Sequence, residues 1–351
     1  MQGNVMDNKQ RLQTILDGGV PDVPPHWELV FQLGKERFGM DPKPLRDATY
    51  PSQEAKGEAL ATFEAEMYAR CVEELGWAAV PGGYESRKVA LTRKIIADKA
   101  LVAAYEGDGV FWMPSGNDIM DFTVQLYEDF PGLLAKARQK CDKAKEYFAQ
   151  AVDAGADFFM LTYDFGFNDN PFISPEHFHE LCAPFLTECV EKIHSLGKKV
   201  ILHSDGCLAK ILDDIHQSGI DGYQSVDPQG HMDIRDVRAK YPNWILMGNV
   251  ACNMLQDCNE KQIRESVQYC MQHGGIGKRY IFSTSNCIFS GMPTDSYRIM
   301  LDEYHRLIAK VINVSIGLRS SSRTLAEGGL FSASHTIRGP SGVGGPSGVS
   351  P

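Results

Sequence analysis

Three features are missing from this 351-residue sequence, and each absence excludes a class of protein. Basic residues are not in excess: 35 Lys and Arg stand against 45 Asp and Glu, a net charge of -10, which excludes proteins that neutralise nucleic-acid phosphates. No apolar run approaches the roughly 20 residues that span a bilayer, and residues 1–25 lack the apolar region of a signal peptide. We therefore expect a soluble, cytoplasmic protein that binds neither nucleic acid nor membrane.

Paired cysteine motifs are also missing. The nine cysteines are an odd number and include no CxxC pair, so the sequence indicates neither a secreted disulfide framework nor a zinc ribbon. Free cysteines in such a protein are mostly small core residues. A chemical role for any one of them therefore needs support from its position in the fold.

The C-terminal stretch 320–351 has a composition of its own. It contains eight Ser, seven Gly and three Pro, and the pentapeptide GPSGV occurs in it twice. Such a segment has too little apolar surface to offset the entropy of ordering. We expect a disordered Ser/Gly/Pro-rich tail over 320–351 and a single folded domain over 1–319.

The folded part repeats one local plan, in which an amphipathic helical stretch ends at a glycine and a short apolar run follows at once. Glycine is the usual residue after a helix, and apolar runs without alternation are typical of strands buried on both faces of a parallel sheet. Eight such units favour a (β/α)8 TIM barrel over an open sheet. The predicted strands are 26–30, 77–80, 109–113, 157–163, 199–203, 220–226, 244–249 and 280–285.

The active site of a barrel of this kind lies at the C-terminal ends of its strands. Polar or reactive side chains that follow the predicted strands are therefore candidates for function. They are His26, Trp27, Glu28, Tyr163, Asp164, His203, Ser204, Asp205, Asp227, Asn249, Asn286 and Cys287.

His203 and Cys287 form the most informative pair, because they follow the fifth and eighth strands and would meet in one mouth. Imidazole and thiolate are zinc ligands, and a catalytic zinc usually takes three protein ligands and leaves a fourth position open. Asp205 is a candidate third ligand, and Cys207 at a helix start is the reserve. The structural alternatives are a hydrogen-bonded imidazole and a buried thiol. Asp164 is open to three interpretations, a general base, an orienting carboxylate or a turn acid.

Four segments resemble the uroporphyrinogen decarboxylase superfamily, over roughly residues 7–312. They are NKQRLQTILDGGVPDVPPHWEL, NPFISPEHFHELCAPFLTECVEKIHSLGKKVILHSDG, GIDGYQSVDPQGHMDIRDVRAKYPNWILMGNV and YIFSTSNCIFSGMP. The superfamily includes haem-pathway decarboxylases and zinc-dependent methyltransferases that act with corrinoids or coenzyme M. The resemblance implies a (β/α)8 barrel, in agreement with the pattern of strands.

The two branches of this superfamily differ in their residues. The decarboxylases carry an RQAGR-type motif after the first strand, whereas HWELVFQLGKERFGM here lacks paired arginines to grip several carboxylates. The methyltransferases use His-x-Cys after strand five and Cys after strand eight as zinc ligands. His203 and Cys287 match two of these positions, and Asp205 replaces the middle Cys, which makes a bound metal more Lewis acidic.

The resemblance therefore implies a zinc methyltransferase that moves a methyl group between a small methylated substrate, or a thiol, and a corrinoid partner. Its expected zinc ligands are His203, Asp205 and Cys287, with Asp164, Glu28 and Tyr163 as the catalytic or orienting groups. Two alternatives stay open. One is a metal-independent decarboxylase of porphyrin biosynthesis, with arginines such as Arg37 or Arg87 in the pocket, and the other is a non-catalytic tetrapyrrole- or corrinoid-binding protein.

Overall fold

A computed structural model describes residues 6–328 of the chain. The chain divides into two compact units, Met1–Ala309 and Lys310–Pro351, and the barrel and the candidate site lie in the first. The last helix, α14 (Thr294–Gly328), contains the boundary between them. The stretch predicted as a disordered tail is therefore helical up to Gly328, and its remainder lies outside the described residues.

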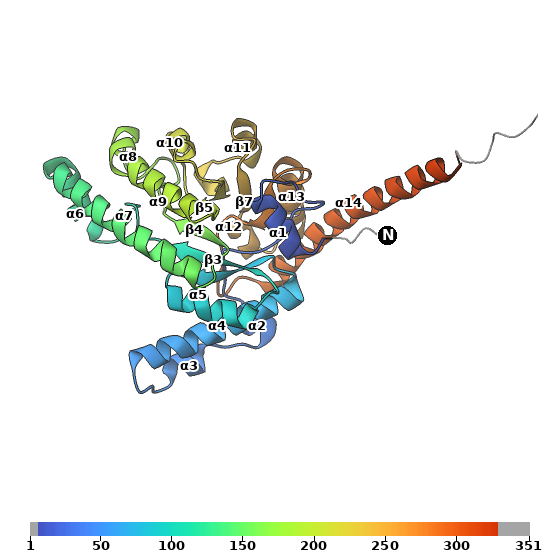
Figure 1. Cartoon of the computed structure of the whole chain (residues 1–351), viewed down its shortest axis with the longest axis horizontal. Coiled ribbons are helices and arrows are strands. Elements are labelled where there is room, and N and C mark those ends of the chain that lie inside the picture. The colour runs from blue at the N-terminus through green and yellow to red at the C-terminus, as the bar shows by residue number, and fades with distance from the viewer. Residues whose placement is uncertain (1–5, 329–351) are drawn as a thin grey trace, which may run out of the picture. The chain divides into compact units, whose positions relative to one another are not determined.

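Seven parallel strands form one sheet, in which each strand pairs with the next along the chain (Figure 1). All seven are almost entirely buried, which explains their apolar sequences without alternation. The strands are β2 (Ala79–Gly83), β3 (Leu101–Glu106), β4 (Phe158–Thr162), β5 (Val200–His203), β6 (Gly222–Ser225), β7 (Ile245–Val250) and β8 (Tyr280–Thr284).

A short extended segment, residues 25–27, closes the sheet into a barrel. On one side the Phe282 N–H donates to the Pro25 carbonyl at 2.8 Å and the Trp27 N–H donates to the Phe282 carbonyl at 3.4 Å. On the other side the Ala78 N–H donates to the His26 carbonyl at 2.9 Å, just before β2 begins. This segment takes the place of the eighth strand, so the predicted (β/α)8 barrel is confirmed.

A separate two-stranded sheet lies just beyond the barrel, in the chain that follows segment 25–27 and the chain that follows β8. β1 (Val30–Phe31) pairs in parallel with β9 (Cys287–Ile288), with Val30 opposite Cys287. The pairing holds Cys287 at the mouth of the barrel rather than in a free loop. The predicted first strand, 26–30, is thus divided between the closing segment and β1.

The helices lie on the outside of the barrel and in the loops at its mouth (Figure 1). The long helix α4 (Gln53–Leu75) ends where Gly76 adopts a φ of +69°, a left-handed conformation that glycine adopts readily. The helices before α14 are α1 (Asn8–Leu16), α2 (Gly34–Phe38), α3 (Lys43–Asp47), α4 (Gln53–Leu75), α5 (Ser86–Ile96), α6 (Asp118–Glu128), α7 (Phe130–Asp153), α8 (Pro175–Leu181), α9 (Ala183–Ser195), α10 (Leu212–Gln217), α11 (Ile234–Lys240), α12 (Cys252–Gln256) and α13 (Glu260–Cys270), with short turns η1 (Pro228–Gly230) and η2 (Met271–Gly275).

The prediction of the third strand at 109–113 was wrong, because β3 occupies Leu101–Glu106. Four of the six residues in its sequence, LVAAYE, are alanine, leucine or glutamate, which favour helices in isolation. Burial between β2 and β4 makes it a strand, and the sequence pattern alone does not reveal that tertiary context. Within residues 6–328, no helix is long and apolar enough to cross a membrane.

Candidate active site

A cavity of about 730 Å³ opens at the C-terminal ends of the strands, where sequence reasoning placed the active site. This volume is typical of pockets for small molecules. Its lining includes Asp164, His203 and Cys287 together with several aromatic side chains. Residues from the ends of β3, β4 and β5 therefore share one mouth with the chain that follows β8.

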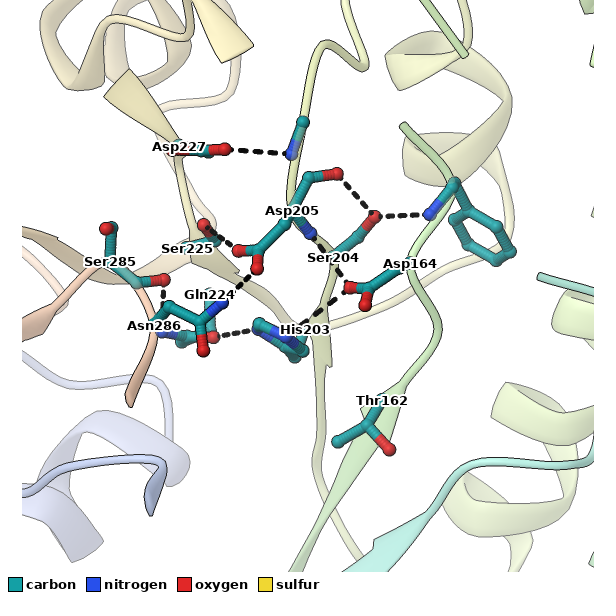
Figure 2. A network of polar contacts seen from close by, with 12 residues as sticks. Thr162, Asp164, His203, Ser204, Asp205, Gln224, Ser225, Asp227, Ser285 and Asn286 are labelled. Atoms are coloured by element: carbon teal, nitrogen blue, oxygen red, sulfur yellow. Dashed lines mark hydrogen bonds and ion pairs between the residues drawn. The ribbon is translucent and has the colours of Figure 1, made fainter. Parts of the chain in front are cut away.

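Asp164, His203 and Asp205 form the main polar cluster at this mouth (Figure 2). Each offers one ligand atom, and the three atoms all lie within 4.8 Å of one another. Asp164 Oδ1 is 3.5 Å from His203 Nε2 and accepts a hydrogen bond of 3.2 Å from the Asp205 N–H. The parallel register explains the cluster: Thr162 pairs with His203, so Asp164 and Asp205 each lie two residues beyond a paired position.

Gln224 on β6 fixes the tautomer of His203. The Gln224 side-chain amide donates to the carbonyls of Thr284 and Ser285 at 3.3 and 3.1 Å, so its oxygen must face the imidazole. His203 Nδ1 then donates to Gln224 Oε1. With the proton on Nδ1, the lone pair is on Nε2, which points toward Asp164. An imidazole held in this way is ready to bind a cation through Nε2.

Asp205 is held from two sides. The Ser225 hydroxyl donates to Oδ1 at 2.7 Å, and the Asn286 side-chain amide donates to Oδ2 (Figure 2). Burial raises the pKa of the Asp205 carboxyl, and the neighbouring His203 opposes that rise. A partly buried carboxylate beside an imidazole gains from a bound cation, which offsets the cost of burying its charge.

The tight turn after β5 depends on glycine. Gly206 has a φ of +83°, and a Cβ there would collide with the Gly166 carbonyl and lie 2.7 Å from the Phe167 oxygen. The Gly206 N–H donates to Asp227 Oδ2 at 3.0 Å, so the turn is tied to the end of β6. This close approach of two backbones directs the side chains of His203 and Asp205 into the cluster.

Cys287 lines the same cavity but lies outside the cluster of Asp164, His203 and Asp205. Burial, reinforced by the charges of Asp205 and Asp164, raises the pKa of the Cys287 thiol to about 12. Without a cation the thiol is therefore protonated at neutral pH. A bound metal ion would reverse this balance, because it stabilises the thiolate.

Two predicted catalytic residues are fully buried away from the cavity lining. The Glu28 carboxylate accepts hydrogen bonds from the Ser283 hydroxyl, from the N–H and hydroxyl of Thr284, and from His26 Nε2, at 2.8 to 3.1 Å. Tyr163 donates its hydroxyl proton to Glu106. These contacts give Glu28 and Tyr163 structural partners, and neither side chain lines the cavity.

The reserve ligand Cys207 is half-buried, and its N–H donates to the Phe167 carbonyl at 2.8 Å. It is not part of the metal-ligand groups found among the described residues.

Sequence reasoning missed Glu106 and Gln224. Glu106 ends β3, is 7% exposed and lines the cavity, and burial raises the pKa of its carboxyl. Glu106 was not among the candidates because the third strand was predicted at 109–113. A predicted strand ending at residue 106 would have included it. Gln224 lies within a strand instead of after one, so only the register shows that it reaches His203.

The donor set fits zinc. His203 offers one nitrogen with its second nitrogen already hydrogen-bonded, the usual arrangement of a metal-bound histidine. Asp205 and Asp164 add carboxylate oxygens, and Cys287 adds a thiol at the edge of the same mouth. Nitrogen, oxygen and sulfur ligands of this kind are those of zinc sites.

Several solved structures resemble this chain, and the first of those named here shares its fold. A solved methyltransferase from Methanosarcina mazei is 13% identical with a TM-score of 0.69, and the match covers 86% of this chain and 99% of that chain. A sugar phosphate isomerase/epimerase from Parabacteroides distasonis is 10% identical with a TM-score of 0.43, covering 81% and 97%. An N-acetylneuraminate lyase from Fusobacterium nucleatum is 10% identical with a TM-score of 0.38, covering 78% and 77%. No curated protein matches the chain in sequence.

The family profile of uroporphyrinogen decarboxylase (URO-D) matches residues 116–307. This range is more than half of the 351 residues, and it includes β4 to β8 with the cluster of Asp164, His203 and Asp205. The chain therefore belongs to the uroporphyrinogen decarboxylase family.

Proposed function

We propose that this protein is a zinc-dependent methyltransferase that moves a methyl group between a small methylated substrate, or a thiol, and a corrinoid on a partner protein. The observation that carries the proposal is the cluster of Asp164, His203 and Asp205 at the mouth of the barrel, in which Nδ1 of His203 is bonded to Gln224 and Nε2 faces Asp164. The fold shared with a methyltransferase is consistent with it.

In this proposal His203 and Asp205 hold the metal ion, and Cys287 is the third ligand that the sequence predicted. Asp164 already lies within the cluster and is the competing third ligand. When bound, zinc supplies Lewis acidity, which lowers the pKa of a thiol or polarises the atom that carries the methyl group.

The chain's own residues bind and orient around that centre. Gln224 keeps the His203 ring in one tautomer, and Ser225 and Asn286 hold the Asp205 carboxylate. Asp164 is half-buried and lines the cavity, so its carboxylate can accept a proton from a substrate that enters there.

The lining of the cavity argues against the decarboxylase alternative. Of the described residues, those lining the cavity include two lysines and no arginine. Arg87 instead pairs with Glu54 on the outside at 2.5 Å, and Arg37 lies on α2 outside the lining. A substrate with several carboxylates would lack the bidentate arginine contacts that such groups favour.

Elemental analysis of protein purified without chelators tests the proposal. We expect one zinc per chain, lost in His203→Ala and reduced at least tenfold in affinity in Cys287→Ala. Cys258→Ala is the matched control, because Cys258 is an exposed cysteine outside the cavity. Metal-free wild-type protein, or equal zinc in His203→Ala, would overturn the proposal.

Cobalt substitution then separates the two candidates for the third ligand. Thiolate-to-cobalt absorption that is present in wild type and lost in Cys287→Ala identifies the cysteine. A spectrum without this absorption, together with metal loss in Asp164→Asn, assigns the third position to Asp164.

A further inference from the structure

Four aromatic side chains, Tyr84, Tyr105, Trp112 and Tyr147, line the cavity beside His203 and Cys287. The rings of Tyr84 and Tyr105 meet almost at right angles, at 85°, with their centroids 5.6 Å apart. Two perpendicular rings form a corner, a shape that surrounds a rounded group on two sides. We call these four residues the aromatic wall.

The polar atoms of the aromatic wall are already used within the protein. Tyr105 donates its hydroxyl proton to the Leu29 carbonyl at 2.7 Å, and Tyr147 donates to the Gly83 carbonyl at 3.1 Å. The Trp112 indole donates to the Gly107 carbonyl at 2.8 Å. The Tyr84 hydroxyl lies 3.2 Å from the Thr162 hydroxyl. A ligand therefore meets mostly ring surface here, with few free donors to bind an ether or phenol oxygen.

Acidic groups accompany these rings. Glu106 and Asp164 both line the cavity, and the chain as a whole carries a net charge of -10. Of the two lysines in the lining, Lys140 is paired with Asp108, and Lys143 is exposed, with no ion-pair partner among residues 6–313, whose side chains the structure describes. Apart from Lys143, the lining of the cavity therefore offers aromatic faces and carboxylates, the two groups that attract an organic cation.

We propose that the aromatic wall is a cage for the head group of a methylated ammonium compound. This inference rests on the proposed function, because it names the class of the methyl donor. A quaternary ammonium group has no proton to donate, so it needs no hydrogen-bond acceptor from the tyrosine hydroxyls or the indole. Its charge is spread over methyl groups that fit an aromatic corner and are attracted by the ring faces. Glu106 adds a nearby negative charge.

Calorimetric titration of the full-length protein with a pair of ligands of equal shape tests this proposal. Choline and 3,3-dimethylbutan-1-ol differ in one respect, since a charged nitrogen in the first replaces a neutral carbon in the second. We expect choline to bind at least tenfold more tightly. Equal affinities for the two, or no binding of either, would overturn the proposal.

Variants of Tyr84 place the binding at the wall. Tyr84 is 55% exposed, so its replacement leaves the barrel core intact. Tyr84→Phe keeps the ring and should retain choline affinity within about twofold, whereas Tyr84→Leu should lose about tenfold. Tyr127→Leu is the matched control, because Tyr127 is an exposed tyrosine on α6 outside this cavity. Equal loss in Tyr84→Phe and Tyr84→Leu, or equal loss in Tyr127→Leu, would contradict the assignment.

The same samples separate this proposal from the proposed function. Choline binding is measured without turnover, and zinc content is measured independently. If zinc content depends on His203 but choline binds no more tightly than the neutral alcohol, only the proposal of an ammonium cage is contradicted. If the protein prefers choline but holds no zinc, only the proposal of a zinc-dependent methyltransferase is contradicted.

Discussion

The Nδ1 atom of His203 on β5 donates a hydrogen bond to the side-chain oxygen of Gln224 on the neighbouring strand β6. The Gln224 amide group cannot turn around, because its nitrogen donates to the carbonyls of Thr284, the last residue of β8, and of Ser285. Contacts among β5, β6 and the end of β8 therefore leave Nε2 of His203 as the imidazole nitrogen available at the mouth.

Gln224→Leu is expected to weaken zinc binding by about 10–100-fold, because the imidazole loses the partner that fixes its tautomer and orientation. A competition titration with a chromophoric chelator measures the affinity. Gln217→Leu on α10 is the control, since Gln217 is exposed and does not line the cavity. Equal zinc affinity in wild type and Gln224→Leu would mean that the hydrogen bond between Gln224 and His203 does not support zinc binding.

Glu28→Gln separates a structural role from the catalytic role that the sequence predicted for Glu28. The carboxylate accepts four hydrogen bonds in a fully buried position, three on Oε2 from Ser283 and Thr284 and one on Oε1 from His26 Nε2. An amide that keeps its oxygen toward Ser283 and Thr284 would turn its NH2 group toward the Nε2–H donor of His26. We expect a loss of about 3 kcal/mol in the free energy of unfolding, measured by urea denaturation. Zinc content should be unchanged. Unaltered stability with lost methyl transfer would restore the catalytic role.

Gly206→Ala should disrupt the turn that directs His203 and Asp205 inward, because its Cβ would collide with the Gly166 carbonyl. Gly197→Ala is the matched control: Gly197 also has a positive φ, of +71°, but its Cβ would have open space around it. The control should lose about 1 kcal/mol from the left-handed conformation alone. Gly206→Ala should lose more than twice that amount and most of its zinc. Equal losses of stability, with zinc retained in both, would contradict this account of the turn.

Glu303 gives the protein part of its stability at neutral pH. Arg306 and Arg264, with Gln268, donate hydrogen bonds to this buried carboxylate, and the Arg306 contact is the main cause of a pKa lowered to about 2. Since the pKa is lower in the folded state, the stabilisation is complete above the unfolded value near 4.5 and is lost as pH falls toward 2.

Glu303→Gln should therefore lower the free energy of unfolding by about 2 kcal/mol at pH 7, and the difference from wild type should shrink between pH 5 and about pH 2. Thermal unfolding across that range measures it. Glu265→Gln, on the exposed face of α13, provides the comparison. A difference from wild type that stays constant with pH would show that ionisation of Glu303 is not the cause.

The sequence predicted most of the barrel because its helices end at glycines and its strands are continuous apolar runs. The prediction failed at β3, because its alanines do not indicate a strand in the sequence. Glu106, at the end of β3, was missed for that reason. Asp164 was predicted as a separate acid, because only the pairing of Thr162 with His203 brings it beside Asp205. Gln224 was missed for the same reason. Residue type and order indicate which groups reach the mouth, whereas the register between strands decides which of them touch. The roles predicted for His203, Asp205 and Cys287 stay predictions until metal is measured.

The pairing of Val30 with Cys287 also bears on how the protein is made. On a ribosome, the strand that holds Cys287 emerges long after its partner, so the N-terminal segment must wait for almost the whole barrel to be synthesised. Contacts so distant in sequence form slowly. The cavity is therefore among the last parts of the nascent chain to be completed, and a prematurely terminated polypeptide would lack a closed barrel and a finished mouth.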